Sequence, residues 1–311
     1  MGSLKPTSIT DAARAAAPIP GSAIVGINVL YIVLVTVFTA LRMYTRFSVH
    51  KNLWWDDWTT VVSWAGTLVF CSIGIQMRDH GGGLNFTDVP GAEFTMFNKM
   101  YQNAQMVARV SIFFAKLAIL LLYIRIFYPR GTYKTTLWWV IQAVIWLNLL
   151  YTVGLILTIS LQCVPLHLRY GSPNCANQYD ILLSASTINI ISDTLVLVIP
   201  MGLLWRLHMS RAKKLGIFAL FAFGALAPVF SIARLVYQVA QAKGENKTVI
   251  AETVFLLALA EQVVSIVTGC MPVVSVYFIK RVFNKKSAKV GGKPPNDPNR
   301  TITQILWPNR E

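Results

Sequence analysis

Charged residues are scarce in this sequence. Asp, Glu, Lys and Arg make up only 13% of its 311 residues, whereas soluble globular domains contain roughly one-quarter. Hydrophobic residues account for 55% and occur in long blocks. This composition excludes a soluble domain with a charged surface and predicts an integral membrane protein.

Residues that hold metals and cofactors are also few. The four histidines are scattered over predicted loops and helix ends, and no CxxC, HExxH, GxSxG or phosphate-loop pattern is present. A retinal pigment needs a lysine in the middle of its last helix, but the last apolar block, residues 249–279, has none before Lys280. We therefore expect no metal, no retinal and no other cofactor. The four histidines are His50, His80, His167 and His208.

Seven apolar blocks are long enough to cross a bilayer, since a spanning helix needs about 20 mostly apolar residues. We predict an all-α membrane protein, a bundle of seven transmembrane helices over residues 23–279. A short extracellular tail (1–22) precedes it, and a basic, disordered cytosolic tail (280–311) follows it. The blocks are residues 23–42, 58–77, 101–124, 137–162, 181–205, 215–240 and 249–279.

Lys and Arg cluster in alternate connections, after the first, third, fifth and seventh blocks. The positive-inside rule then places the N-terminus outside and the C-terminus in the cytosol. The net charge of +15 therefore reflects topology, not nucleic-acid binding. Two sequons, at Asn85 and Asn246, fall in loops predicted to be outside, so we expect a glycoprotein.

The four cysteines divide into two pairs. Cys71 and Cys270 lie within apolar blocks and are interpreted as packing residues. Cys163 and Cys175 bracket the outer loop "VPLHLRYGSPN" between the fourth and fifth blocks. An oxidising exterior would let them form a disulfide, and the alternative is two unrelated thiols.

Five ionisable residues lie within these apolar blocks. A charge at membrane depth costs several kcal/mol unless it is paired or hydrated. The stripe Ser186, Asn189 and Asp193 has the spacing of one helical face, which should point into the bundle. Asp193 and Glu261 are expected near mid-depth, Lys116 somewhat deeper, and Arg109 and Arg234 in the outer half. We predict that these groups converge on one internal cavity as a charged network. Its members are Arg109, Lys116, Asn189, Asp193, Arg234 and Glu261.

Two interpretations of this network remain open. In the first, polar groups only hold helices together, with Asp193 against Lys116 and Glu261 against Arg234. In the second, they serve as a ligand counter-ion, a switch or a catalytic acid; Glu261 is then the first candidate and Asp193 the second. By contrast, Asp56 and Asp57 begin the second helix, where carboxylates cap free backbone amides, and capping is the preferred interpretation.

Six fragments in order resemble one known family, the fungal rhodopsin-like seven-helix membrane proteins. This family includes satratoxin-cluster type proteins and is related to appressorium-type fungal receptors. The sequence departs from it at Ala118, where a serine is usual, and near Asn85, where a histidine is usual. The fragments are "LRMYTRF" with "WWDDW", "KLAILLLYIRIF", "CVPLHLRYGSPNC", "NIISDTLVLVIPMGLLWRL", "SIARL" and "EQVVSIVTGCMP".

The resemblance implies a multi-pass protein of the plasma membrane or endoplasmic reticulum, associated with secondary-metabolite biosynthesis. It would act on or accompany a lipophilic small molecule, with membrane lipids as further partners. The alternative is a receptor or sensor of an extracellular ligand, with a cytosolic signalling partner. Against it, the sequence lacks Asp-Arg-Tyr after the third block and Asn-Pro-x-x-Tyr in the seventh. A transporter is disfavoured because no inverted repeat is visible. Whether the protein is an enzyme is left open.

Overall fold

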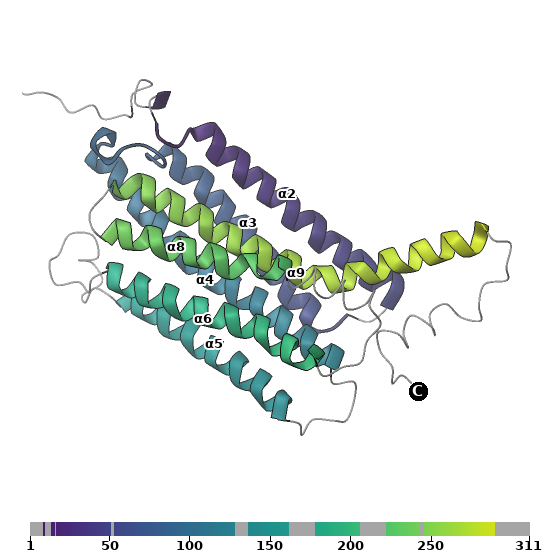
Figure 1. The fold of residues 1–311 in the computed structure, drawn as a ribbon. Coiled ribbons are helices and arrows are strands. Elements are labelled where there is room, and N and C mark those ends of the chain that lie inside the picture. The colour runs from purple at the N-terminus through teal and green to yellow at the C-terminus, as the bar shows by residue number, and fades with distance from the viewer. Residues whose placement is uncertain are drawn as a thin grey trace, which may run out of the picture.

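The computed structural model is a bundle of long helices lying side by side (Figure 1). It describes residues 9, 14–15, 17–50, 53–127, 136–161, 178–205, 222–242 and 246–289. Within these residues, seven helices are long and apolar enough to cross a membrane, which confirms the predicted class. They are α2 (Gly21–Thr45), α3 (Trp55–Asp79), α4 (Gly91–Phe127), α5 (Thr136–Leu161), α6 (Gln178–Trp205), α8 (Leu226–Ala242) and α9 (Lys247–Lys289).

Two helices extend at least ten residues beyond their apolar blocks. Helix α4 begins at Gly91, ten residues before the predicted start at 101. The first turns of α4 contain polar residues, so they were not part of the apolar block. Pro90 directly precedes the helix, and the carbonyl of Pro90 accepts the backbone N–H of Phe94 at 2.9 Å. Helix α9 extends to Lys289, into the tail predicted to be disordered from 280. Residues 280–289 contain no glycine or proline, so nothing local stops the helix.

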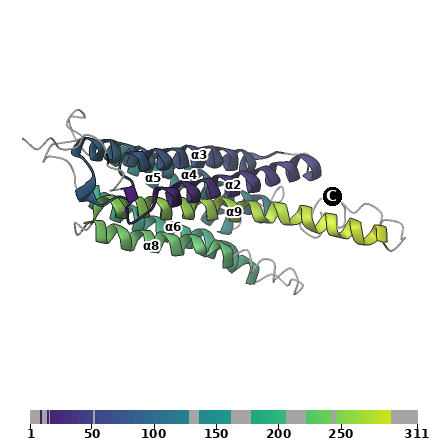
Figure 2. The same ribbon diagram turned by 90° about the horizontal axis from the view of Figure 1, so that it is seen from above.

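Helix α9 is the centre of the bundle. In its spanning part, Lys247–Ser275, 78% of the most apolar window is buried, against 22% for α2 and for α5. It packs against α2, α3, α4 and α8, and in Figure 2 it lies between α2 and α3 on one side and α6 and α8 on the other. Polar groups on α9 can therefore meet partners from most of the other helices.

Close packing of α3 on α9 depends on Gly74. A Cβ at this position would lie 2.4 Å from the ring of Phe255 on α9. The ring also packs against Phe70, with centroids 4.3 Å apart. These aromatic residues belong to a buried apolar cluster shared by α3, α4 and α9. A larger side chain at position 74 would push the two helices apart.

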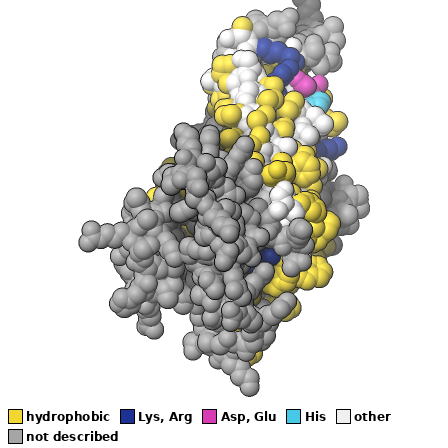
Figure 3. Space-filling view, turned by 90° about the vertical axis from the view of Figure 1, so that its right-hand side faces the viewer, with side chains coloured by type: hydrophobic (Ala, Val, Ile, Leu, Met, Phe, Trp, Pro, Cys, Tyr) yellow, Lys and Arg dark blue, Asp and Glu magenta, His cyan; other side chains and the backbone are white. Residues whose placement is uncertain are grey.

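The outer surface of the described bundle is apolar. Large hydrophobic side chains are exposed along α2, α5, α6 and α8, and Figure 3 shows hydrophobic side chains over most of the described part of one face. Exposed apolar surface of this extent fits contact with membrane lipid. Cys71 and Cys270 are buried free thiols, as expected for packing residues, whereas Cys163 and Cys175 lie outside the described residues.

The two sequons meet at one end of the bundle. The side-chain amide of Asn246 donates to Asn85 Oδ1 at 2.6 Å, and the backbone N–H of Phe86 donates to Asn246 Oδ1 at 2.9 Å. At the opposite end, which we call the basic end, lie Arg42, Asp56 and Arg125. The placement of the sequons on one side agrees with the predicted topology, and the direction across the membrane stays a prediction.

Candidate functional site

Lys116 and Asp193 form a buried ion pair between α4 and α6. The Lys116 Nζ atom lies 3.0 Å from Asp193 Oδ1 and donates to Asn189 Oδ1 at 2.9 Å and Ser192 Oγ at 3.1 Å. An ammonium group has three donors, so these partners satisfy it. The polar stripe of α6 thus faces the interior, and Ser186, Asn189 and Asp193 are all buried.

Asn189 connects the carboxylates of two helices. Its Nδ2 atom lies 3.0 Å from Asp193 Oδ2 on α6 and 2.7 Å from Glu261 Oε1 on α9. The hydroxyl of Ser231, on α8, also donates to Asp193 Oδ2 at 3.0 Å. Because a carboxylate in apolar surroundings is costly unless it is paired, these contacts explain how the bundle accommodates both groups.

Arg234 and Arg109 complete the charged region. Arg234 Nη2 lies 3.2 Å from Glu261 Oε2, so α8 and α9 are joined by a second buried ion pair. Arg109, on α4, interacts electrostatically with Arg234 and Glu261. The six residues predicted as an internal network are therefore brought together, and we call them the central network. Both pairings considered from the sequence are at ion-pair distance.

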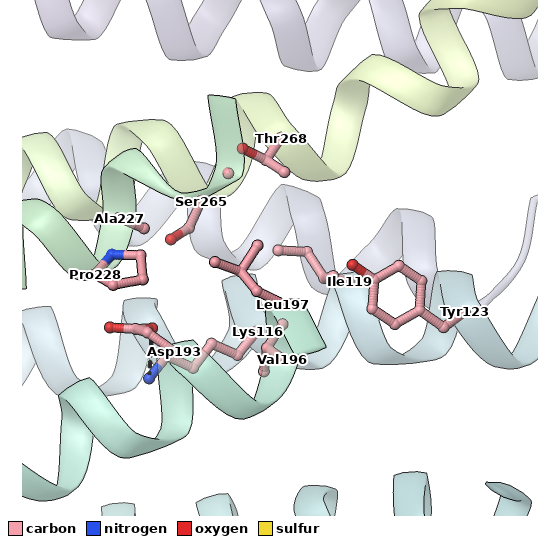
Figure 4. A pocket seen from close by; sticks show the side chains of 11 residues that line it. Lys116, Ile119, Tyr123, Asp193, Val196, Leu197, Ala227, Pro228, Ser265 and Thr268 are labelled. Atoms are coloured by element: carbon pink, nitrogen blue, oxygen red, sulfur yellow. Dashed lines mark ion pairs between the residues drawn. The ribbon is translucent and has the colours of Figure 1, made fainter. Parts of the chain in front are cut away.

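A small cavity lies beside the Lys116–Asp193 pair, and side chains of α4, α6, α8 and α9 turn toward it (Figure 4). It holds about 350 Å3 of empty space including its open mouth, but only about 20 Å3 admits the centre of a water molecule. That is room for about one water, so a larger ligand requires side chains or helices to move. Its wall is mainly apolar, formed by residues such as Ile119, Val196 and Pro228, and includes Asp193 but not Glu261.

Two members of the site were missed by sequence reasoning. Ser192 Oγ donates to Asn148 Oδ1 at 2.6 Å, which connects α6 with α5. Ser192 is three residues after Asn189, so it belongs to the same helical face, but it was not included in the stripe. Asn148 is an isolated amide in an apolar helix, and such a residue signals an interhelical hydrogen bond.

A second polar cluster adjoins Glu261. Its neighbour Gln262 donates to Thr67 Oγ1 at 2.6 Å and also contacts Ser111 Oγ. The hydroxyls of Ser63 and Ser111 each donate to the other residue's backbone carbonyl, at 3.0 and 2.8 Å. These bonds join α3, α4 and α9 through small side chains, as is common between membrane helices.

The basic end contains a buried cluster of three arginines and two aspartates. Asp56 Oδ2 lies 2.7 Å from Arg42 Nη2 and 2.9 Å from Arg46 Nη2, and Asp57 Oδ1 lies about 3 Å from Nε of both arginines. Arg125, from the end of α4, reaches Asp56 Oδ1 at 2.9 Å. We call these five residues the basic-end cluster.

The capping interpretation of Asp56 and Asp57 is therefore incomplete. Asp57 Oδ2 does accept the backbone N–H of Trp54, at 3.3 Å, but the shorter contacts are to the arginines. Arg42 also donates to the carbonyl of Gly269 on α9, at 2.7 Å. Arg42 and Arg46 are four residues apart, a spacing that puts two side chains on one helical face. This spacing is the one sequence signal of a shared partner, and it does not identify that partner.

The sequence profile of the Fungal rhodopsin domain matches residues 41–280. The chain is 30% identical over 234 residues, 74% of its length, to the "SAT4 family membrane protein" of Emericella nidulans. It is 25% identical over 199 residues, 60% of its length, to the "Fugralins biosynthesis cluster protein 2" of Gibberella zeae. It is 26% identical over 204 residues, 62% of its length, to the "Polyenoic acids biosynthesis gene cluster protein Ba17b" of Metarhizium anisopliae.

These matches span about half of each relative, 56%, 48% and 54% of their lengths in the same order. No solved structure matches the chain. The family profile, over residues 41–280, covers most of the helical bundle.

Proposed function

The chain belongs to the fungal rhodopsin domain family, and on this basis we propose that it serves a fungal secondary-metabolite pathway by holding a lipophilic intermediate within its helical bundle. The observation that carries the proposal is the cavity beside Lys116 and Asp193, which combines a mainly apolar wall with a charged pair. Ligand sites commonly combine apolar walls with a few convergent polar groups.

The names of two relatives support the setting. The Gibberella zeae and Metarhizium anisopliae proteins are named for biosynthesis clusters, of fugralins and of polyenoic acids. These products are named for those two proteins and not for this chain. For this chain we propose the same kind of role, with a lipophilic molecule that enters from the surrounding membrane.

The two carboxylates have different positions relative to such a ligand. Asp193 lines the cavity, so a bound molecule would contact it directly. Glu261 lies behind it, where it is fully buried and paired with Arg234. Asp193 is held by three donors, from Lys116, Asn189 and Ser231. Glu261 remains the first sequence-based candidate for a catalytic acid and Asp193 the second, and substitution distinguishes them.

The test uses a deletion strain complemented with wild type, Asp193→Asn or Glu261→Gln, with Ser184→Ala as an exposed control on α6. We expect one pathway intermediate to accumulate in the deletion strain while transcripts of neighbouring genes stay unchanged. Wild type and Ser184→Ala restore the product, and a variant at the carboxylate that acts on the intermediate does not, when strains are compared at equal amounts of protein on immunoblots. Unchanged metabolites in the deletion strain would contradict the proposal.

A receptor or sensor is the second candidate, and the basic-end cluster favours it. Four buried charged residues and the partly buried Arg125 join α2, α3, α4 and a backbone carbonyl of α9 there. Such a set of ionic contacts can rearrange between two states when a ligand binds elsewhere. A joint fall of all pathway products and their transcripts in the deletion strain would support this second function.

A further inference from the structure

Hydrogen-bond donors without partners gather in one buried region beside the central network. Among the described residues, five nitrogen atoms have no hydrogen-bond partner: Nε and Nη1 of Arg109, Nε and Nη2 of Arg234, and Nε2 of Gln238. Arg234 Nη2 is nevertheless at ion-pair distance from Glu261. All five atoms are donors, and the three side chains are at least 95% buried. We call these three residues the donor cluster.

The donor cluster is assembled from two helices. Arg234 and Gln238 are four residues apart on α8 and therefore lie on one face. Arg109 projects from α4 and interacts electrostatically with Arg234 and with Tyr151 of α5. Gln238 is oriented by Ser186 of α6, whose hydroxyl donates to Gln238 Oε1 at 2.5 Å. The amide nitrogen of Gln238 is thereby left as a donor on the same side as Arg234.

Charge in this region is not balanced. The central network contains three cations, Arg109, Lys116 and Arg234, and two anions, Asp193 and Glu261. Lys116 pairs with Asp193 and Arg234 with Glu261, so the surplus cation is Arg109. A buried charge without a partner is far more costly than a neutral polar group.

No other buried carboxylate of the described chain supplies the missing charge. Glu252 is fully buried and both its oxygens lack hydrogen-bond partners among the described residues. However, it precedes Glu261 by nine residues on α9, about 14 Å along the helix axis, and its carboxylate lies beside Gly82, just after the end of α3. An anion from outside the chain would satisfy the donor cluster.

We propose that Arg109, Arg234 and Gln238 bind the anionic oxygen group of an amphipathic acid whose apolar part lies between the helices. This inference rests on the proposed function, because it names the class of molecule that the bundle holds. A guanidinium offers two parallel N–H groups that match a carboxylate or phosphate, and such charge-assisted hydrogen bonds are stronger than neutral ones. The acid comes either from the pathway or from an anionic membrane lipid.

The experiment compares matched probes in nanodiscs of neutral phosphatidylcholine that contain the purified chain. Oleic acid, methyl oleate and oleyl alcohol are added at equal mole fractions of the bilayer, and binding is measured from the shift in melting temperature. We expect oleic acid to bind about tenfold more tightly than the ester or the alcohol, because only the acid offers a charge to the two arginines.

Variants assign that preference to the donor cluster. Arg109→Met and Arg234→Met are expected to bind the three probes equally. Arg78→Met is the matched control, since Arg78, in the last turn of α3, belongs to neither ion pair of the central network, is about one-third exposed and pairs with Asp79. Without ligand, Arg109→Met should melt no lower than wild type because it removes an unpaired buried charge, whereas loss of a purely structural contact would lower the melting temperature.

A second arm identifies the source of the anion. If adding phosphatidylglycerol to the nanodiscs weakens oleic acid binding in wild type but not in Arg109→Met, the anion site is confirmed and an anionic membrane lipid can occupy it. If phosphatidylglycerol has no effect while the acid preference holds, the site is confirmed for a free acid.

Equal binding of acid, ester and alcohol to wild type would overturn the inference, and this comparison needs no variant to fold. An acid preference that survives in both arginine variants would also overturn it. Neither result would contradict the proposed function, which is tested separately. An intermediate that accumulates in the deletion strain would still support a role of the protein in the pathway.

Discussion

At the scale of single residues, Lys116 shows how a charge is tolerated inside this bundle. Its ammonium group has an ionic partner in Asp193 and two neutral acceptors in Asn189 and Ser192. All three donors of the ammonium group are used. These contacts offset the cost of removing the charge from water. Removing either member of the pair leaves the other charge buried alone.

We predict strong coupling between Lys116 and Asp193. Lys116→Met and Asp193→Asn should each lower the free energy of unfolding by about 3–5 kcal/mol, because each leaves an uncompensated buried group. The double variant should lose less than the sum of the two, by about 1–3 kcal/mol. Reversible unfolding of the purified protein in mixed micelles measures all four free energies.

The same cycle between Lys116 and Thr194 serves as the control. Thr194 is exposed and bonds only to the backbone of its own helix, so Thr194→Ala should be additive with Lys116→Met. Additivity of the Lys116 and Asp193 substitutions would show that their ion pair contributes little in the folded protein.

At the scale of helices, the basic-end cluster joins elements that are distant in sequence. Arg42 extends from α2 to both aspartates at the start of α3 and to the carbonyl of Gly269 on α9. The carbonyl belongs to the part of α9 just before Pro272, which lacks an N–H and interrupts the regular hydrogen bonding of the helix. One side chain therefore fixes the relative positions of three helices.

Removing this connection should be far more costly than removing a surface arginine. We expect Arg42→Met to lower the free energy of unfolding by about 3–5 kcal/mol, since Asp56 and Asp57 lose a buried partner. Arg78→Met removes a guanidinium that is paired at the surface and should cost about 1 kcal/mol or less. Thermal unfolding of the two variants side by side tests this, and equal losses would refute the special role of Arg42.

Helix contacts also depend on glycine where backbones approach closely. Gly74→Leu should destabilise the protein by about 1–3 kcal/mol, because the added side chain overlaps Phe255 and forces α3 away from α9. Gly154→Leu is the matched control, since nothing lies within 4 Å of a Cβ at that position on α5. Melting temperatures of both variants in the same detergent measure the difference. A drop as large for Gly154→Leu would mean that overlap with Phe255 is not the cause.

At the scale of the whole molecule, the seven helices form one multi-pass membrane bundle. The apolar exterior faces lipid, and most of the buried polar residues belong to interhelical contacts. The paired sequons and the basic-end cluster lie at opposite ends. Which end faces the cytosol depends on the positive-inside rule, which concerns insertion and not packing.

We predict that the C-terminus is cytosolic. In sealed microsomes, added protease should remove an epitope tag at the C-terminus and leave a tag at the N-terminus intact. Asn85 or Asn246 should carry a glycan that endoglycosidase removes, with Asn85→Gln and Asn246→Gln as controls for each site. A protected C-terminal tag with a digested N-terminal tag would reverse the topology.

Several features of the site could be predicted from single helices. Ser186, Asn189 and Asp193 share a face because of helical periodicity alone, and charges at membrane depth must turn inward because lipid cannot solvate them. The basic-end cluster was harder to predict. Asp56 and Asp57 satisfy a local rule, helix capping. Local rules do not show that Arg42, near the end of α2, and Arg46, just after it, reach the same place.

The sequence by itself determined the class of the protein, the number of spanning helices and the charges of the central network, because each of these depends on the transfer of side chains between water and lipid. Only the tertiary structure decided which charges pair, since partners such as Arg42 and Asp57, or Asn189 and Glu261, come from different helices. It alone also showed that, among the described residues, no carboxylate lies at ion-pair distance from Arg109, because ion pairs between helices become visible only when the helices are packed.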